Sequence, residues 1–119
     1  MRLVSIFLLL GACATPPELR FAADAGDAWC GRTRACDELR YWRTFDGGTP
    51  DCLDWVLTRV RRYERSTGLV CRYDDATAEA ALSQIASRSC EDLWDDNRES
   101  AYFNPFDCVS LDGRSSGGR

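Results

Sequence analysis

The sequence predicts an all-α domain: a small, disulfide-stapled bundle of about three to four helices with an irregular C-terminal tail. Three observations support this class. Apolar residues recur at helical spacing in several segments of the 119-residue chain. No segment shows the alternation of apolar and polar residues that is typical of a half-buried strand. Seven cysteines are spread along the chain, as in small exported domains that rely on cross-links.

The first residues of the chain predict export. Arg2 is followed by an apolar run over residues 3–10, interrupted only by Ser5. A charged start and an apolar run of this length are typical of a signal peptide, whereas a membrane-spanning helix needs ~20 apolar residues. We therefore expect residues 1–12 to be a signal peptide that is absent from the mature protein.

The end of this leader resembles a bacterial lipobox. Leu10, Gly11 and Ala12 precede Cys13, and in lipoproteins of that kind the cysteine thiol receives diacylglycerol. The resemblance implies that Cys13 is the lipidated first residue of the mature chain. More than one acyl chain, palmitate for example, is enough for stable anchoring. Ala14 is not the aspartate that usually retains such lipoproteins in the inner membrane, so the resemblance implies the cell outer membrane.

Lipidation of Cys13 would also account for the odd number of cysteines. An even set then remains, which predicts three disulfides in an oxidising compartment. This set consists of Cys30, Cys36, Cys52, Cys71, Cys90 and Cys108. Zinc binding is disfavoured because the chain has no C-x2-C pair and no histidine. We expect neither a metal nor another cofactor.

The expected order of the helices favours one arrangement of the disulfides. The first bond would join the end of one helix to the start of its antiparallel neighbour, and the second would pin the irregular tail to the last helical turn. The third follows by elimination. The expected pairs are Cys36–Cys52, Cys90–Cys108 and Cys30–Cys71. Each would contribute on the order of 3 kcal/mol in the chain-entropy account.

The mature chain divides into a tether, a domain and a tail. Residues 13–19 contain two prolines and no helical periodicity, so we expect a tether there. Residues 20–112 should form the cysteine-rich helical domain. Residues 113–119 are rich in glycine and serine and should form a disordered tail.

The domain should begin with two helical segments. Apolar residues at intervals of three, four and seven predict a helix over residues 18–39. In residues 37–45, Leu39, Trp42 and Phe45 recur at three-residue spacing, which predicts a continued apolar face.

The strongest predicted helix covers residues 49–68. Thr49 is a good N-cap, Pro50 suits the first helical turn, and Gly68 follows the last turn. Its buried face should consist of Cys52, Trp55, Val56, Val60 and Tyr63.

A further helix is expected over residues 75–88, capped by Asp74 or Asp75. Its inward residues should be Ala78, Ala81, Leu82 and Ile85. Ser89 should then cap a short additional turn. Beyond residue 97 the pattern indicates loops.

Composition excludes several functions. The absence of histidine excludes Ser-His-Asp and Cys-His catalysis. Without Arg2 the mature chain has 14 basic and 19 acidic residues, a net charge of −5, which disfavours nucleic-acid binding. Carboxylate chemistry of the glycosidase kind remains conceivable, but a three-helix domain of this size rarely has a deep enough cleft.

Two sets of residues are candidates for ligand contacts. Arginine binds phosphate groups bidentately, and four arginines near the end of helix 49–68 form a candidate anion-binding site: Arg59, Arg61, Arg62 and Arg65. The alternative is that they only balance the helix dipole. Four tryptophans either line a ligand groove or form most of the core: Trp29, Trp42, Trp55 and Trp94.

The spacing C-x5-C at residues 30–36, "SCEDL" at residues 89–93 and "PFDCVSLDG" at residues 105–113 resemble small six-cysteine lipoproteins of two-membrane bacteria. The resemblance implies location and fold class but no activity. We therefore expect a lipid-anchored envelope protein, not an enzyme, that binds a partner or has a structural role. Its partners would be the membrane and either an envelope protein or an anionic envelope polymer.

Two alternative functions remain open. A rigid stapled domain suits an inhibitor of a secreted hydrolase, which would need an exposed, ordered loop such as residues 99–107. A small carboxylate-dependent cell-wall hydrolase would instead need a pocket with two facing carboxylates.

We predict that Cys13 carries the lipid. Mass spectrometry of the N-terminal peptide from native membranes should find a mature chain that begins at a diacylated Cys13. Replacing Cys13→Ser should release an unlipidated precursor from the membrane fraction, because the thiol is the acceptor of the lipid. An unmodified N-terminal peptide that retains Met1 would contradict the prediction.

Overall fold

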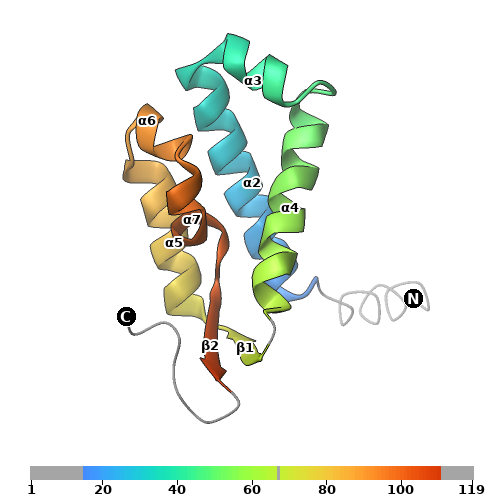
Figure 1. Ribbon diagram of the computed structural model, residues 1–119, viewed down its shortest axis with the longest axis vertical. Helices are drawn as coiled ribbons and strands as arrows, with labels where there is room; N and C mark the ends of the chain where they lie inside the picture. Colours follow the sequence, from blue (N-terminus) through green and yellow to red (C-terminus); the bar gives the residue numbers. More distant parts are fainter. Residues whose placement is uncertain (1–14, 67, 111–119) are drawn as a thin grey trace, which may run out of the picture.

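The computed structural model describes residues 15–66 and 68–110 (Figure 1). Its elements in chain order are α2 (Pro17–Cys36), α3 (Glu38–Thr44), α4 (Thr49–Glu64), β1 (Leu69–Tyr73), α5 (Asp75–Ser87), α6 (Cys90–Leu93), the 3-10 turn η1 (Asp96–Arg98), α7 (Glu99–Phe103) and β2 (Phe106–Ser110). The predicted disulfide-stapled helical class is confirmed. The signal peptide, Cys13 and the tail at 113–119 lie outside the described residues.

Helix α2 is the central element of the bundle. It lies between α4 and α5 and runs antiparallel to α4, so that the first turn of α2 and the last turn of α4 are at the same end (Figure 1). The short helix α3 crosses the opposite end. The two strands lie near the end where α2 begins. The tether was predicted to continue to residue 19, but α2 already starts at Pro17.

Gly26 explains how α2 and α4 pack so closely. A Cβ atom at this position would lie 2.9 Å from Cδ2 of Leu53 on α4, well inside van der Waals contact. Glycine is unfavourable in the interior of a helix, yet here it permits close approach of the two helices. The disulfide Cys30–Cys52 joins the same pair of helices.

The turn between α3 and α4 depends on Gly48. Its φ of +79° is a conformation that residues with side chains rarely adopt, and a Cβ would lie 2.7 Å from the ring of Trp42. Gly48, and not Thr49, is the N-cap of α4. Thr49 is the first helical residue, and its hydroxyl accepts a hydrogen bond from the Tyr41 hydroxyl at 3.1 Å.

The three-residue spacing in α3 was misleading. Leu39 is 62% exposed and Trp42 is 42% exposed, whereas Phe45 is buried as expected. The buried partner of Phe45 is Tyr41, which lies one helical turn earlier. Asp37 ends α2 and caps α3 by accepting a hydrogen bond from the Arg40 amide, so the predicted helix over 18–39 is divided here.

Both later capping predictions are confirmed. Asp74 caps α5 by accepting from the amide of Thr77 at 2.8 Å, and Ser89 caps α6 by accepting from the amide of Asp92 at 3.2 Å. Hydrogen bonds from Thr77 lower the pKa of Asp74. The inward face of α5 is as predicted, with Leu82 only partly buried.

The absence of strands was a wrong prediction. Strands β1 and β2 form an antiparallel two-stranded sheet in which Cys71 pairs with Cys108 and Val70 with Val109. Val70 is 55% exposed and Val109 37% exposed. Because apolar residues occupy both faces of this short sheet, the sequence shows no clean alternation. The region beyond residue 97, predicted as loops, contains η1, α7 and β2.

All three predicted disulfide pairs are wrong. The observed bonds are Cys30–Cys52, Cys36–Cys90 and Cys71–Cys108. The prediction assumed that the end of α2 meets the start of α4. Instead α3 separates these two ends, so that Cys52 lies beside an earlier turn of α2, and the end of α2 meets the start of α6. The third bond connects directly paired strand residues.

The hydrophobic core lies entirely between Phe21 and Cys108. All six disulfide cysteines and every helix and strand described above lie within residues 17–110. A chain that begins at Ala14 therefore contains every contact of the described fold, and it suits experiments in solution.

The disulfide pairing has an unambiguous chemical test. Trypsin cleaves after arginine, and each resulting peptide contains at most one of the six domain cysteines. Without reduction, peptide 35–40 should be linked to peptide 89–98, and peptide 66–72 to peptide 99–114. A link between peptides 35–40 and 44–59, as the sequence-based pairing requires, would contradict the structure.

The Cys36–Cys90 bond closes the longest loop of the three, with a sequence separation of 54. Replacing both cysteines by serine should lower the free energy of unfolding by about 4 kcal/mol in the chain-entropy account. The measurement is urea denaturation followed by circular dichroism. The matched control is Cys71→Ser with Cys108→Ser, which opens a shorter loop and should cost slightly less. An unchanged denaturation midpoint for the first variant would contradict the pairing.

Candidate functional site

The core is built around Trp29 of α2. Its ring contacts four others, with centroids 5.1 to 6.1 Å away: Phe45, Trp55, Trp94 and Phe103. These rings come from the ends of α3 and α6, from α4 and from α7. The indole Nε1 donates a hydrogen bond to the carbonyl oxygen of Leu93 at 3.0 Å. The polar group of the buried ring is therefore satisfied inside the core.

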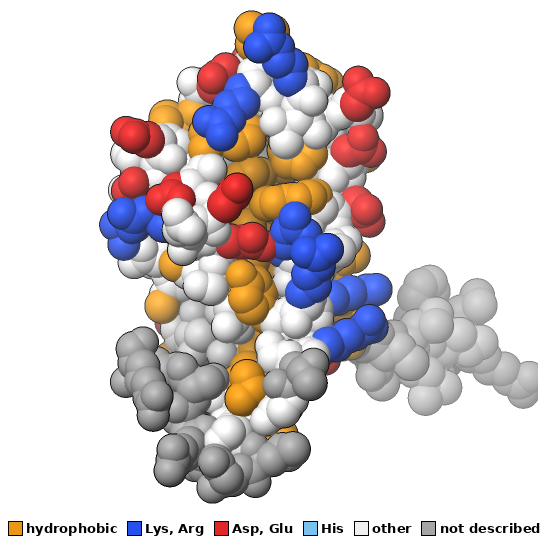
Figure 2. Space-filling model, in the orientation of Figure 1, with side chains coloured by type: hydrophobic (Ala, Val, Ile, Leu, Met, Phe, Trp, Pro, Cys, Tyr) orange, Lys and Arg blue, Asp and Glu red, His pale blue; other side chains and the backbone are white. Residues whose placement is uncertain are grey.

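One side of this ring cluster forms a pocket of about 280 Å³. Trp29, Trp55 and Trp94 line it, and we call it the aromatic pocket. Its other lining includes charged side chains from α3, α4, α7 and the segment between α6 and α7: Arg40, Arg59, Asp95, Asp96 and Glu99. Figure 2 shows exposed hydrophobic side chains in the upper half of this face, bordered by acidic side chains and arginines.

Two arginines stack on the rings of the aromatic pocket. Arg59 lies one turn after Trp55 on α4, with Cζ 4.6 Å from the ring centroid, and its Nε is 2.8 Å from a carboxylate oxygen of Glu99. Arg40 lies 4.4 Å from the centroid of Trp94 and has no ion pair with any described residue. Cation–π contacts at such partly exposed sites contribute ~0.5–1 kcal/mol each. They hold the guanidinium groups over the rings.

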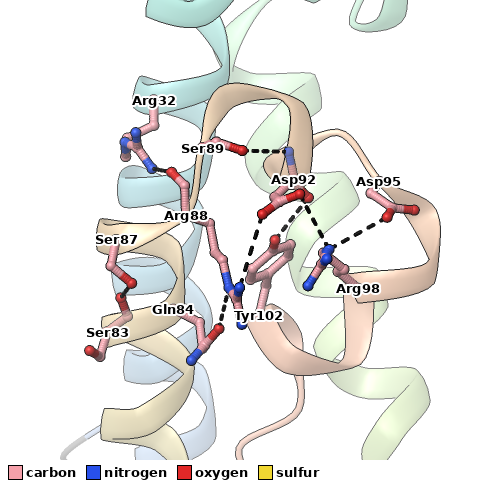
Figure 3. A network of polar contacts seen from close by, with 10 residues as sticks. All are labelled: Arg32, Ser83, Gln84, Ser87, Arg88, Ser89, Asp92, Asp95, Arg98 and Tyr102. Atoms are coloured by element: carbon pink, nitrogen blue, oxygen red, sulfur yellow. Dashed lines mark hydrogen bonds and ion pairs between the residues drawn. The ribbon is translucent and has the colours of Figure 1, made fainter.

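A polar network centred on Asp92 fixes the segment between α6 and α7 (Figure 3). The Asp92 amide donates to Ser89, and the Asp92 carbonyl accepts from the Tyr102 hydroxyl at 2.8 Å. The Asp92 carboxylate lies 3.5 Å from Arg98 Nε and 4.0 Å from Arg88 Nη1. Burial raises the pKa of Tyr102 and the charge of Asp92 raises it further, so the hydroxyl keeps its proton at neutral pH.

The same segment is tied to the central helix. Arg32 of α2 donates to the carbonyl oxygen of Arg88 at 2.6 Å (Figure 3). It also donates to the carbonyl oxygen of Ile85 at 2.8 Å, and so satisfies groups at the C-terminus of α5. The disulfide Cys36–Cys90 follows one turn later on α2. The segment that carries Trp94 and two of the carboxylates is therefore held by covalent, ionic and hydrogen-bonded contacts.

The pocket brings carboxylates together without the arrangement that glycoside hydrolysis needs. Glu99 is paired with Arg59, and Asp95 lies 3.5 Å from Arg98. Only the Asp96 side chain has no partner within residues 15–66 and 68–110. Two carboxylates free to reach a substrate are required for that reaction.

The structure separates the four arginines of the predicted anion-binding site. Arg59 faces the aromatic pocket, and its side chain is only 22% exposed. Arg61, Arg62 and Arg65 are exposed and line a shared hollow with Thr58. We call these three residues the arginine face. None of them forms an ion pair with another described residue, and Figure 2 shows arginines gathered over the second half of α4.

An apolar groove borders the arginine face. It lies between α2 and α4, has a volume of about 480 Å³, and is lined mainly by Leu19, Ala22, Leu53 and Leu57. Arg61 lines both the groove and the hollow. Leu19 is in the first turn of α2, so the groove starts close to the point where the chain leads toward Cys13.

Residues 99–107 are not an exposed loop, because Tyr102, Phe103, Pro105 and Phe106 are buried. Within the described ranges, no helix is long and apolar enough to cross a membrane. In the same part of the chain, no three acidic, cysteine or histidine side chains are grouped to hold a metal ion.

The aromatic pocket itself was not predicted. A tryptophan-lined groove and a tryptophan core were alternatives from the sequence, whereas Trp29, Trp55 and Trp94 contribute to both a pocket and the core. One local signal was present. Trp55 and Arg59 are four residues apart on a confidently helical segment, a spacing that places the guanidinium over the ring.

We predict that the arginine face binds anionic membranes. Each arginine near such a surface contributes roughly 1 kcal/mol, so Arg61→Gln, Arg62→Gln and Arg65→Gln together should weaken the partitioning of the chain starting at Ala14 by up to about 100-fold. The measurement is sedimentation with phosphatidylglycerol-containing vesicles at low and high salt. Binding should fall with salt because exposed charges are screened.

The matched control removes three arginines at the other end of the bundle. The variant Arg34→Gln, Arg40→Gln and Arg43→Gln has the same net charge as the first variant. Its vesicle binding should fall only by the effect of net charge, and therefore less than that of the first variant. Equal losses in both triple variants would show that only net charge matters. Negligible binding by the parent chain would favour the alternative that these arginines only balance the helix dipole.

No protein family, curated protein or solved structure matches this chain. The function must therefore be inferred from the chemistry of the pocket and the arginine face.

Proposed function

We propose that this chain is a lipid-anchored protein of the bacterial outer membrane that acts by binding a small ligand in the aromatic pocket. The observation that carries the binding role is the pocket itself. Three tryptophans line a concave site that has several charged groups around it. Apolar sites with a few convergent polar groups are typical of ligand binding.

The location part of the proposal rests on the leader. The lipobox-like residues before Cys13 and the even set of domain cysteines both favour export and lipid attachment. Three disulfides among the described residues agree with an oxidising compartment. The leader and the disulfides together support an envelope location. The mass spectrometry of Cys13 tests the lipid attachment.

The structure also favours binding over a purely structural role. A structural protein needs a stable fold but no preserved cavity, and cores normally fill such space. Here Trp55 and Trp94 are only partly buried, although they pack against the buried core. Arg59, which is stacked on Trp55 and paired with Glu99, lines this cavity together with Glu99.

Site-specific photo-crosslinking in intact cells tests the binding role. A photoreactive phenylalanine analogue replaces Thr44, which is exposed at the edge of the aromatic pocket. We expect an adduct of defined mass, because a bound ligand would lie within reach of this position. The control places the same analogue at Ala80, an exposed residue of α5 that does not line the pocket. The same adducts from both positions, or none from Thr44, would contradict the proposal.

A further inference from the structure

We infer that the ligand of the aromatic pocket is a sugar ring of an envelope glycan. This inference rests on the proposed binding function and specifies its ligand class. A sugar ring has C–H groups on its faces and hydroxyl groups around its edge. The pocket has a complementary arrangement at Trp94, whose ring face is covered by the exposed side chain of Arg40 and lies beside charged side chains. The ring of Trp55 is already stacked against Trp29 and Arg59 and serves as the wall of the pocket.

The aromatic surfaces suit the faces of a sugar. The face of an indole ring is electronegative because of its quadrupole, and C–H groups carry a small positive charge. Such contacts are weak individually, but a flat sugar face meets several ring atoms at once. The volume of about 280 Å³ is at the lower end of the range for small-molecule sites, roughly 300–1,000 Å³. One sugar unit at the end or side of a longer chain suits this size.

The charges around the pocket argue against other ligand classes. A fully apolar ligand would bury charged groups without replacing their contacts with water. A phosphate or carboxylate ligand would meet Asp95, Asp96 and Glu99. A cationic ligand would be repelled by the guanidinium groups of Arg40 and Arg59, which lie over the rings. A neutral ligand whose groups both donate and accept hydrogen bonds avoids each of these costs.

Two polar groups of the pocket have no hydrogen-bond partner among the described residues. A sugar could supply a partner to each of them. The Nε1 atom of Trp94 is buried and has no acceptor among the described residues. The Asp96 carboxylate has no donor in the same set of residues. An unsatisfied buried group such as this N–H is uncommon in native proteins, whereas Asp96 is exposed and its carboxylate is open to water. A hydroxyl or acetamido oxygen can accept from the indole N–H, and a hydroxyl can donate to Asp96.

Arg40 is the one group that a ligand would have to displace. It is exposed, and its only described side-chain contact is the stacking on Trp94. An arginine held only in this way is easily moved. Displacement would open the Trp94 ring and free the guanidinium to donate to sugar hydroxyls, since it has five N–H donors. Arg59 would remain in place because Glu99 holds it.

The test uses the ¹⁵N-labelled chain that begins at Ala14, titrated with the β-1,4-linked trimer of N-acetylglucosamine. The four indole N–H signals in a ¹H–¹⁵N spectrum report on each tryptophan separately. We expect the signal of Trp94 to shift in the millimolar range and that of Trp42 to stay unchanged. No shift up to 20 mM, a concentration on the order of the weakest useful affinities, would overturn the inference.

Two variants localise the binding. Trp94→Phe keeps an aromatic ring but removes the N–H, and Asp96→Asn removes the negative charge. Each should weaken binding roughly three- to tenfold, as expected for the loss of one hydrogen bond. The matched controls are Trp42→Phe and Asp107→Asn, which change the same groups outside the pocket. Equal weakening by the controls would overturn the inference. Circular dichroism confirms that each variant is folded.

A second probe separates the ligand classes. Tetramethylammonium is a cation without hydroxyl groups, and it should shift the indole signals less than the trimer does. Stronger binding of this cation than of the sugar would overturn the glycan inference. The proposed binding function would survive that result if the crosslinked adduct at Thr44 still formed in cells. Loss of the adduct would contradict the function itself.

Discussion

The position of Trp29 is the constraint on which the rest of the structure depends. This one ring, 3% exposed, touches rings from four other segments and donates its N–H to the carbonyl of Leu93. Large aromatic residues bury 150–250 Å² each, roughly, and removing one from a core costs about 3–5 kcal/mol. The short elements α6, η1 and α7 have too few residues to be stable as isolated helices. Their packing around Trp29 substitutes for the length that they lack.

Packing alone would leave those short elements free to shift, and the polar network prevents this. Asp92 joins α6, η1 and α7 through its amide, its carbonyl and its carboxylate (Figure 3). Arg32 and the Cys36–Cys90 bond attach the same region to α2. A pocket lined by side chains from separate segments keeps its shape only if each segment is fixed. The contacts that stabilise the fold thus also preorganise the site.

The sequence predicted those features that depend on local contacts. The caps at Asp74 and Ser89 and the buried faces of α4 and α5 follow from residues within a few positions of each other. The disulfide pairs, the exposed Leu39 and the aromatic pocket depend on how distant elements pack. In α3 a spacing of three residues is compatible with burial, but the direction of the crossing helix decides which side is covered. The pocket combines residues from 29 to 103, a span that no local pattern reveals.

Helix α4 shows how one element can serve two surfaces. Trp55 and Arg59 share the side of the helix that faces the aromatic pocket, whereas Arg61 and Arg65 share the outer side. Because α4 runs antiparallel to α2, its last turn lies at the end of the bundle where the chain leads toward Cys13 (Figure 1). The four residues from Cys13 to Pro17 can span at most ~14 Å. If Cys13 is the anchor, the arginine face is therefore held near the headgroups, and the α3 end of the bundle, next to the aromatic pocket, points away from the membrane. A short tether limits how far the domain can move from the membrane. In this arrangement it would also direct the pocket toward glycans outside the bilayer.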